Sequence, residues 1–245
     1  MGVPLDRGRE VLQRYRTWAA EVPDEFTTIA AVVTAPPAPF VPPELVGQKI
    51  VGLVGCWCGD PDAGVSALNP LRELQPAFDV FGPMPYAVLQ GMLDEGAPPG
   101  IRSYTRSGYA ADLSDGMIDV ALEHGGTMPS PFSQLHLHHM GGAVARVGEA
   151  DTAFGNRRAA YAYNVNSLWM DPSEDDLHEE TNRKFAIALA PFSTGGVYVN
   201  FLGNEGEARV RAAYGDAKYE RLSTLKRTFD PENLFRLNQN IPPAP

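Results

Sequence analysis

Three of the five histidines in this chain of 245 residues lie within four positions of one short segment. The segment reads SQLHLHHMGG, residues 133–142, and it ends on a glycine pair. Polar and apolar residues alternate there with a period of two, which predicts a half-buried strand with Gln134, His136 and His138 on one face. Such a row of imidazoles could bind a metal ion, line a polar pocket or face solvent.

Metal binding is the least favoured of these three roles. Two imidazoles that lie two residues apart on a strand chelate zinc, iron or copper only when further ligands converge on them. No carboxylate or cysteine lies at a spacing that suggests such convergence. We therefore expect no metal site, and the residue pattern alone leaves the pocket and the solvent-facing strand equally open.

Two further segments place polar side chains at alternate positions. The segment GGVYVNFLG, residues 195–203, reads as a strand with Tyr198 and Asn200 on one face. The segment YAYNVNSLWM, residues 161–170, reads as another strand on which Asn164 and Asn166 share a face. These amides and this phenol could line one cavity with the histidines.

Other polar groups have a structural explanation. The acids between positions 174 and 180 are best explained as the solvated start of a helix, where negative charge complements the helix dipole, and not as a catalytic carboxylate pair. Asn233, in FDPENLF, is best explained as a turn residue.

Composition and charge exclude some classes of function. The formal net charge is −10 and the sequence pI is near 4.9, without a run of lysines and arginines, so a nucleic-acid partner is not expected. No stretch has the apolar length of a membrane span, and the first residues lack the apolar core of a signal peptide. We expect a soluble cytoplasmic protein without a membrane partner.

The two cysteines lie two residues apart in the segment GCWCGD. Strand alternation points Cys56 and Cys58 to one side, where a disulfide would be strained, and two thiols alone do not complete a zinc site. We interpret them as small core-filling residues, with an oxidation-sensitive pair as the alternative.

The pattern of apolar residues and breakers predicts an α+β domain. Strand pairs that follow one another without an intervening helix favour an antiparallel sheet with helices packed on one side, followed by a C-terminal helix and an extended tail. The expected elements are a helix over 11–19, strands over 26–35 and 49–57, a helix from the cap Asp60 to 74 with a break or kink at Pro70, loop, short helix and loop over 78–100, a helix capped by Ser114 up to 126, strands over 131–140 and 161–170, a helix from Ser173 to 191, a strand over 195–203, a helix over 214–231 and an irregular tail.

Several motifs resemble one family of flavoproteins. The run YERLSTLKRTFDPENLFRLNQNIPP, residues 219–243, is similar to the closing signature of FAD-linked oxidases of the berberine-bridge-enzyme-like group, which belongs to the vanillyl-alcohol-oxidase type. The segments STGGVYVNFLG, GGAVARV, TAPPAPF and GPMPY also resemble members of that group, and the resemblance extends from Tyr15 onward. Members normally carry an N-terminal FAD-binding domain, and nothing here corresponds to it. The resemblance implies a substrate-binding domain, residues 1–195, and a berberine-bridge-like C-terminal segment, residues 196–245.

The resemblance also implies roles for individual residues. Tyr198 would lie over the flavin as a base or a substrate-orienting phenol, and His138 would take the place of a polar or acidic catalytic group. The substrate pocket would be lined by Gln134, His136, Asn164 and Asn166, and the cofactor would be approached by Asn200, Asn238 and Gln239.

These expectations define two hypotheses about function. The first is a lobe of an FAD-dependent oxidase that positions an organic alcohol, sugar or secondary-metabolite substrate over the flavin, and that is incomplete without an FAD-binding domain. The alternative is a non-catalytic binding or partner domain that kept the substrate pocket. In either case a separately encoded FAD-binding domain or a second copy of the chain is a candidate partner.

Overall fold

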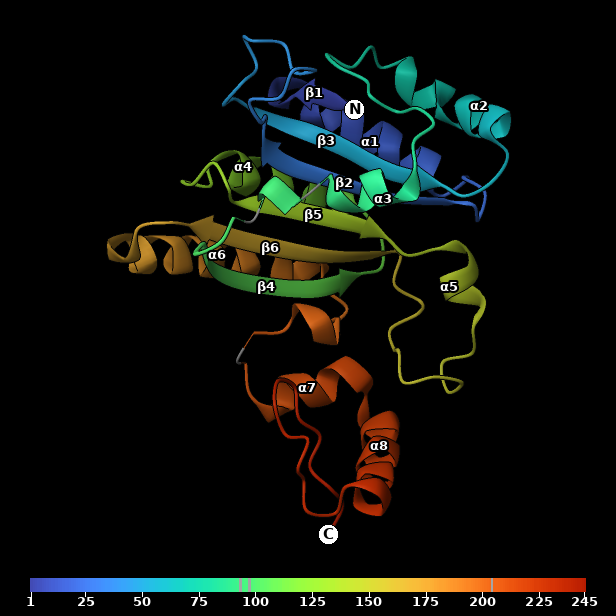
Figure 1. Cartoon of the computed structure of the whole chain (residues 1–245), viewed down its shortest axis with the longest axis vertical. Coiled ribbons are helices and arrows are strands. Elements are labelled where there is room, and N and C mark those ends of the chain that lie inside the picture. Colours follow the sequence, from blue (N-terminus) through green and yellow to red (C-terminus); the bar gives the residue numbers. More distant parts are fainter. Residues whose placement is uncertain (93, 97, 204) are drawn as a thin grey trace.

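A six-stranded antiparallel sheet forms the body of the molecule (Figure 1). The computed structural model describes residues 1–92, 94–96, 98–203 and 205–245. The strand order across the sheet is β1-β3-β2-β5-β6-β4, and every neighbouring pair is antiparallel. The strands are β1 (Gly2–Pro4), β2 (Phe26–Thr34), β3 (Lys49–Trp57), β4 (Arg102–Ala110), β5 (Gln134–His139) and β6 (Tyr161–Trp169). The sheet and its helices confirm the predicted α+β class.

One face of the sheet is covered by helices α1 (Gly8–Ala19), α4 (Asp115–Gly126) and α6 (Asp175–Leu189), which lie behind it in Figure 1. Helix α1 buries Val11, Leu12 and Tyr15, which recur at helical spacing, against the sheet. Burying one such aliphatic side chain contributes about 1.5–3 kcal/mol. The main core therefore lies between the helix layer and one face of the sheet. The side chains on the other face are not part of this core.

Shorter helices lie around this body. Helix α2 (Pro61–Arg72) packs against α1, α3 (Tyr86–Gly91) crosses in front of the sheet, and α5 (Gly142–Arg146) follows β5 (Figure 1). The expected loop, short helix and loop over 78–100 is confirmed by α3 for the described part of that segment, and positions 93 and 97 lie outside the described residues.

Two predicted helix caps are confirmed. The Asp60 carboxylate accepts hydrogen bonds from the backbone N–H groups of Asp62 (3.0 Å) and Ala63 (3.2 Å), and the Ser114 hydroxyl accepts one from Met117 (3.3 Å). Of the break or kink expected at Pro70, the break is wrong, because α2 continues to Arg72. A proline in the last turn removes a single helical hydrogen bond, so the helix tolerates it.

The start of α6 differs from the prediction. Ser173 is not the cap: it lies in a 3-10 turn, Pro172–Glu174, that precedes the helix. Its backbone N–H donates to the carboxylate of Asp171 at 2.9 Å, so Asp171 satisfies the first free donor instead.

The strand expected over 195–203 is wrong. Residues Val199–Phe201 form a 3-10 turn, in which the N–H of Phe201 donates to the carbonyl of Tyr198 at 2.9 Å. The segment before the turn is fixed to the sheet by an isolated bridge between Ala110 and Ser193. The N–H groups of Phe201 and Leu202 bond to carbonyls within the turn. Residues 199–202 therefore do not add a strand to the sheet.

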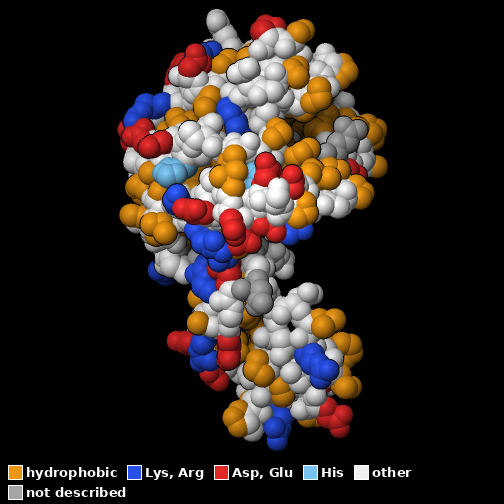
Figure 2. Space-filling view, turned by 90° about the vertical axis from the view of Figure 1, so that its left-hand side faces the viewer, with side chains coloured by type: hydrophobic (Ala, Val, Ile, Leu, Met, Phe, Trp, Pro, Cys, Tyr) orange, Lys and Arg blue, Asp and Glu red, His pale blue; other side chains and the backbone are white. Residues whose placement is uncertain are grey.

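Residues 197–245 form a narrower unit below the sheet, which Figures 1 and 2 both show. It contains α7 (Glu207–Tyr214), α8 (Asp216–Phe229) and the irregular tail. A small separate core, in which Val197, Val210 and Tyr219 are buried, holds it together. On α8, Tyr219 is buried in this small core, whereas Phe229 at the end of the helix is 82% exposed.

Strands β1 and β4 and helix α7 were not predicted. Strand β4 reads RSYTRSGYA, a mainly polar edge strand without the apolar run that marks a buried one.

The cysteine prediction also needs correction, since Cys56 is half-buried and Cys58 is exposed, so they do not fill the core. No described helix combines the length and the apolar composition that crossing a membrane requires.

Asn182 connects α6 to the sheet and gives a test of this packing. Its side-chain amide is fully buried and donates to the carbonyls of Tyr104 (3.0 Å) and Val165 (2.9 Å) and to the hydroxyl of Ser167 (3.1 Å). We predict that Asn182→Ala lowers the free energy of unfolding by about 2 kcal/mol, because buried acceptors lose their donor.

Urea unfolding measures this change, and Lys184→Ala on the exposed side of the same helix is the matched control. The control should change the free energy by less than about 0.5 kcal/mol. Equal effects of the two substitutions would contradict the anchoring role of Asn182.

Candidate active site

The face of the sheet opposite α1, α4 and α6 carries the imidazoles and amides singled out in the sequence. We call it the open face. The predicted alternation of β5 is confirmed, because Leu135 and Leu137 are fully buried on the helix side while Gln134, His136 and His138 are half-buried on the other side.

The register between β5 and β6 places the expected amides beside the imidazoles. Asn164 pairs with His136, and Asn166 pairs with Gln134. The hydroxyl of Thr105, one strand further, donates to the amide oxygen of Asn166 at 3.0 Å. The structure thus gathers a continuous group of uncharged polar side chains across the three strands.

The open face of the five long strands carries no aspartate, glutamate, lysine or arginine. Its positions follow from the strand register, and they are Thr27, Ile29, Ala31 and Val33 on β2, Ile50, Gly52, Val54 and Cys56 on β3, Ser103, Thr105, Ser107 and Tyr109 on β4, Gln134, His136 and His138 on β5, and Ala162, Asn164, Asn166 and Leu168 on β6. In a chain of net charge −10, this face is suited to a neutral ligand that forms hydrogen bonds.

The histidines of the open face are uncharged at neutral pH. Burial lowers the pKa of His136 from 6.5 to about 4, and the neighbouring His138 lowers it further. Burial also lowers the pKa of His138, and Asn164 beside it partly offsets this. The Nε2 atom of His136 lies 2.6 Å from the side-chain oxygen of Gln134, so its N–H donates there.

Two buried polar atoms of this group have no hydrogen-bond partner among the described residues. They are Nε2 of His138 and the side-chain oxygen of Asn164. Leaving a buried polar atom unpaired costs about 1–3 kcal/mol. A ligand that supplied a donor and an acceptor here would offset this cost, so the two atoms are candidate contacts for a ligand.

The 3-10 turn that replaces the expected strand brings Tyr198 to the same site. The ring of Phe201 lies between the two candidate catalytic residues, 5.0 Å from the ring of Tyr198 and 5.4 Å from that of His138, measured between centroids. Tyr198 also packs against the cluster that contains Tyr109 and Ala162. Tyr198 and His138 therefore contact the same ring, that of Phe201, from the turn and from the sheet.

Asn200 acts on Tyr198 through a direct contact. Its side-chain amide donates a hydrogen bond of 2.7 Å to the phenol oxygen of Tyr198. The expectation that the two share a strand face is wrong, but the turn still joins their side chains. This amide donor fixes the position of the phenol oxygen of Tyr198.

The tail residues lie behind this turn. The amide of Gln239 donates to the carbonyls of Leu202 (2.9 Å) and Gly203 (3.1 Å), and so holds the backbone that follows Tyr198. Asn238 is exposed in the tail with a left-handed φ of 59°. The roles beside a cofactor expected for Asn238 and Gln239 stay predictions. Asn233, which also has a positive φ of 52°, lies at a turn as expected.

Sequence reasoning missed the contributions of β4 and of Phe201. Thr105, Ser107 and Tyr109 alternate along β4, and this period of two was the available signal. Burial raises the pKa of Tyr109, so its phenol stays protonated and serves as a wall of the site. No pattern in the sequence indicated that the ring of Phe201 would lie against that of His138, a sheet residue more than 60 positions earlier in the chain.

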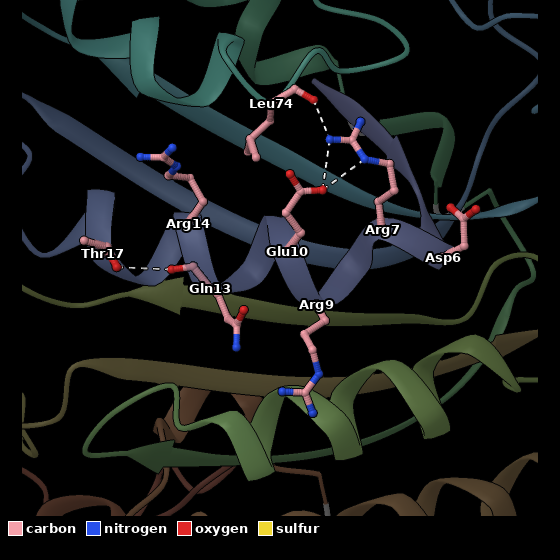
Figure 3. Close-up of a pocket in the computed structure, with 8 residues that line it drawn as sticks. All are labelled: Asp6, Arg7, Arg9, Glu10, Gln13, Arg14, Thr17 and Leu74. Atoms are coloured by element: carbon pink, nitrogen blue, oxygen red, sulfur yellow. Dashed lines mark hydrogen bonds and ion pairs between the residues drawn. The ribbon is translucent and has the colours of Figure 1, made fainter.

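A hollow lies on the exposed side of the helix layer, away from the open face. It has a volume of about 650 Å³ and is lined by the exposed side of α1 and by Leu74 (Figure 3). Its charges are largely compensated: Arg7 pairs with Glu10 at 3.0 Å and donates to the Leu74 carbonyl at 2.8 Å. We interpret this hollow as a solvated, charged helix surface. Among the described residues, no group of three or more histidine, cysteine or acidic side chains is arranged to hold a metal ion.

Comparisons with known proteins all point to one group of flavoproteins. Residues 197–242 match the family model described as "Berberine and berberine like". An uncharacterized FAD-linked oxidoreductase of Bacillus subtilis, YgaK, is 35% identical over 252 residues, which cover 97% of this chain and 51% of the relative. The FAD-linked oxidoreductase OXR1 of Pyricularia oryzae is 27% identical, with 91% of this chain and 45% of the relative covered.

Solved structures show the same fold. The 6-hydroxy-D-nicotine oxidase of Arthrobacter nicotinovorans superposes with a TM-score of 0.78 at 19% identity, covering 100% of this chain and 53% of that one. Berberine-bridge-enzyme-like protein 28 of Arabidopsis thaliana gives a TM-score of 0.74 at 14% identity, with 100% and 56% covered. The chain therefore spans about half the length of the relatives that it matches.

The neutral state of the His136 imidazole gives a test of the site's electrostatics. We expect NMR titration of the full chain to give a pKa of about 4 for His136, assigned by loss of its signal in His136→Gln. Between pH 6.5 and 4 the unfolded chain then binds a proton that the folded chain does not, so the free energy of unfolding falls as the pH falls through this window.

His136→Gln removes this contribution. The variant should therefore lose less stability on acidification than the parent chain, by up to about 3 kcal/mol at 1.4 kcal/mol per pH unit. Urea unfolding at neutral pH and near pH 4.5 measures the difference. A His136 titration midpoint near 6.5, or the same acid dependence in both proteins, would show that the imidazole is solvated.

Proposed function

Because the chain belongs to the berberine-bridge-enzyme-like group of FAD-linked oxidoreductases, we propose that its open face is the substrate-facing wall of a flavin-dependent oxidase. The observation that carries this proposal is the convergence of Tyr198, with Asn200 bonded to its phenol oxygen at 2.7 Å, and His138 on an uncharged face. The substrate that this wall suits is an organic alcohol, a sugar or a related neutral metabolite.

The residues of the open face fit the flavin ring system of FAD, whereas the sequence offers no binding segment for its pyrophosphate. The unpaired buried atoms of His138 and Asn164 lie on a broad uncharged face, which suits a planar ring system with a substrate beside it. The sequence holds no GxGxxG segment for a pyrophosphate. We infer that the adenine and pyrophosphate of FAD are held by another lobe, in a longer chain or in a separate subunit.

In this arrangement Tyr198 removes a proton from the substrate hydroxyl. Tyr198 acts as this base after its own phenol proton has passed to solvent, and the Asn200 amide then donates to the phenolate oxygen. Nε2 of His138 and the amide oxygen of Asn164 bind and orient the substrate. FAD, when bound, would accept the hydride, and oxygen would reoxidise it.

The exposed surface of residues 197–245 supports a missing lobe. Hydrophobic side chains lie on this lower unit in Figure 2, and the most exposed ones are Phe229, Leu234, Phe235 and Leu237. Such a group of exposed apolar side chains marks a surface that another unit covers. The separate small core that includes Val197 supports the division into domains at residues 195 and 196.

The alternative function is a partner domain without catalysis, which the same exposed surface favours. The two are separated by flavin chemistry: a catalytic lobe needs flavin at about one per chain once the second lobe is supplied, whereas a partner domain needs none.

Substitution of Tyr198 tests the hypothesis that its phenol is the catalytic base. In the enzyme assembled with an FAD-binding lobe, we predict that Tyr198→Phe slows substrate-dependent flavin reduction by about 10²-fold or more, because general-base catalysis contributes about 10²–10⁴-fold. Stopped-flow absorbance measures the rate, and the flavin content should not change.

Tyr214→Phe is the matched control, since Tyr214 packs in the core of the lower unit, away from the open face. It should reduce flavin at the parent rate. An unchanged rate in Tyr198→Phe, with normal flavin content, would remove Tyr198 from the mechanism.

A further inference from the structure

The two cysteines of the chain lie in contact at the end of β3. Their sulfur atoms are 3.7 Å apart, and both are free thiols. Cys56 occupies the open face of β3, opposite Thr27 on β2, and Cys58 follows directly after the strand ends. They are the two cysteines of the whole sequence, so any disulfide within one chain must join them.

The backbone around the pair holds both thiols on the same side. The side chain of Trp57 points the other way: its indole N–H donates to the Asp60 carbonyl at 2.7 Å, and its ring meets that of Phe26 at 5.8 Å between centroids. The N–H of Cys58 donates to the Glu25 carbonyl at 2.9 Å. With the intervening residue fixed, the two thiols stay beside each other, and a disulfide requires their sulfurs to approach from 3.7 Å to about 2 Å.

The two thiols differ in their surroundings. Cys58 is exposed, whereas Cys56 is half-buried, and burial, with a smaller contribution from Cys58, raises the pKa of the Cys56 thiol. The thiolate is the nucleophile in thiol oxidation, and access decides which thiol reacts first. Cys58 is therefore the attacking residue and Cys56 the resolving one.

We propose that Cys56 and Cys58 are a modification site at which hydrogen peroxide forms a reversible disulfide within the chain. The Cys58 thiolate attacks one oxygen of the peroxide: an S–O bond forms, the O–O bond breaks, and the released hydroxide takes up a proton to become water. The Cys56 sulfur, on losing its proton, then attacks the Cys58 sulfenic acid and releases a second water. Two thiols are oxidised by two electrons in total, and one peroxide is reduced to two waters.

The disulfide should be easy to reduce. A bridge between cysteines separated by one residue closes a small ring with unfavourable geometry, and strained disulfides have more oxidising potentials than relaxed ones. The fraction of chains that carry the disulfide would therefore depend on the ratio of peroxide to thiol reductants. This inference does not rest on the proposed oxidase function, because any source of peroxide serves.

Mass spectrometry of the full chain tests the proposal. The reduced protein is treated with a small excess of hydrogen peroxide, and the remaining thiols are blocked with a maleimide. We expect free thiols to fall from two per chain to none, with loss of two hydrogen atoms in mass, a monomer on non-reducing gels, and full recovery of both thiols with dithiothreitol.

Single serine variants separate the two roles. Cys56→Ser should leave a Cys58 sulfenic acid that dimedone traps, and Cys58→Ser should consume peroxide several-fold more slowly. Circular dichroism confirms that each variant is folded. Two thiols that persist in the parent chain, oxygen adducts in place of the disulfide, or disulfide-linked dimers would each overturn the proposal.

Discussion

The pairing register of β5 with its two neighbours is the constraint on which the rest of this structure depends. Side chains alternate across a strand, so a slip by one residue would turn every side chain of β5 to the opposite face. In the observed register Leu135 and Leu137 are fully buried against the helix layer. The same register turns His136 toward Asn164 on the open face. The burial of two leucines thus fixes the place of the polar group that gives the site its chemistry.

The chemical character of the site follows from this arrangement. The imidazoles are held in a half-buried row without a neighbouring charge, so their neutral forms are favoured and they serve as hydrogen-bonding groups at neutral pH. Tyr198 arrives from a different part of the chain, because the bridge between Ala110 and Ser193 fixes the preceding segment to the end of β4. Phe201 then fills the space between the phenol and His138. Packing therefore joins a sheet residue and a turn residue that are distant in sequence.

The elements that the sequence predicts correctly are those whose pattern of polar and apolar residues matches their burial in the structure. Strands β2, β3, β5 and β6 combine regular alternation or β-branched runs with clear ends, and Asp60 and Ser114 are caps by local chemistry. Strand β4 is missed because it has no apolar pattern of its own. Its extended conformation depends on pairing with β6, which the local sequence does not reveal. The segment 195–203 alternates like a strand, yet its backbone bonds within itself, and no local pattern reveals that outcome. The shared face of Gln134, His136 and His138 was predictable, whereas their approach to Phe201 depends on tertiary packing.

The most direct test of the account asks whether the open face accepts the isoalloxazine ring. Flavin mononucleotide, which carries that ring, is titrated into the full chain while the histidine side-chain signals are followed by NMR. The account predicts saturable shifts of His136 and His138. His124 and His178 should be unaffected, because they lie on α4 and α6, where they stack against Phe185 and Trp169. Shifts confined to His124 and His178, or no shift of the open-face pair at millimolar flavin mononucleotide, would contradict it.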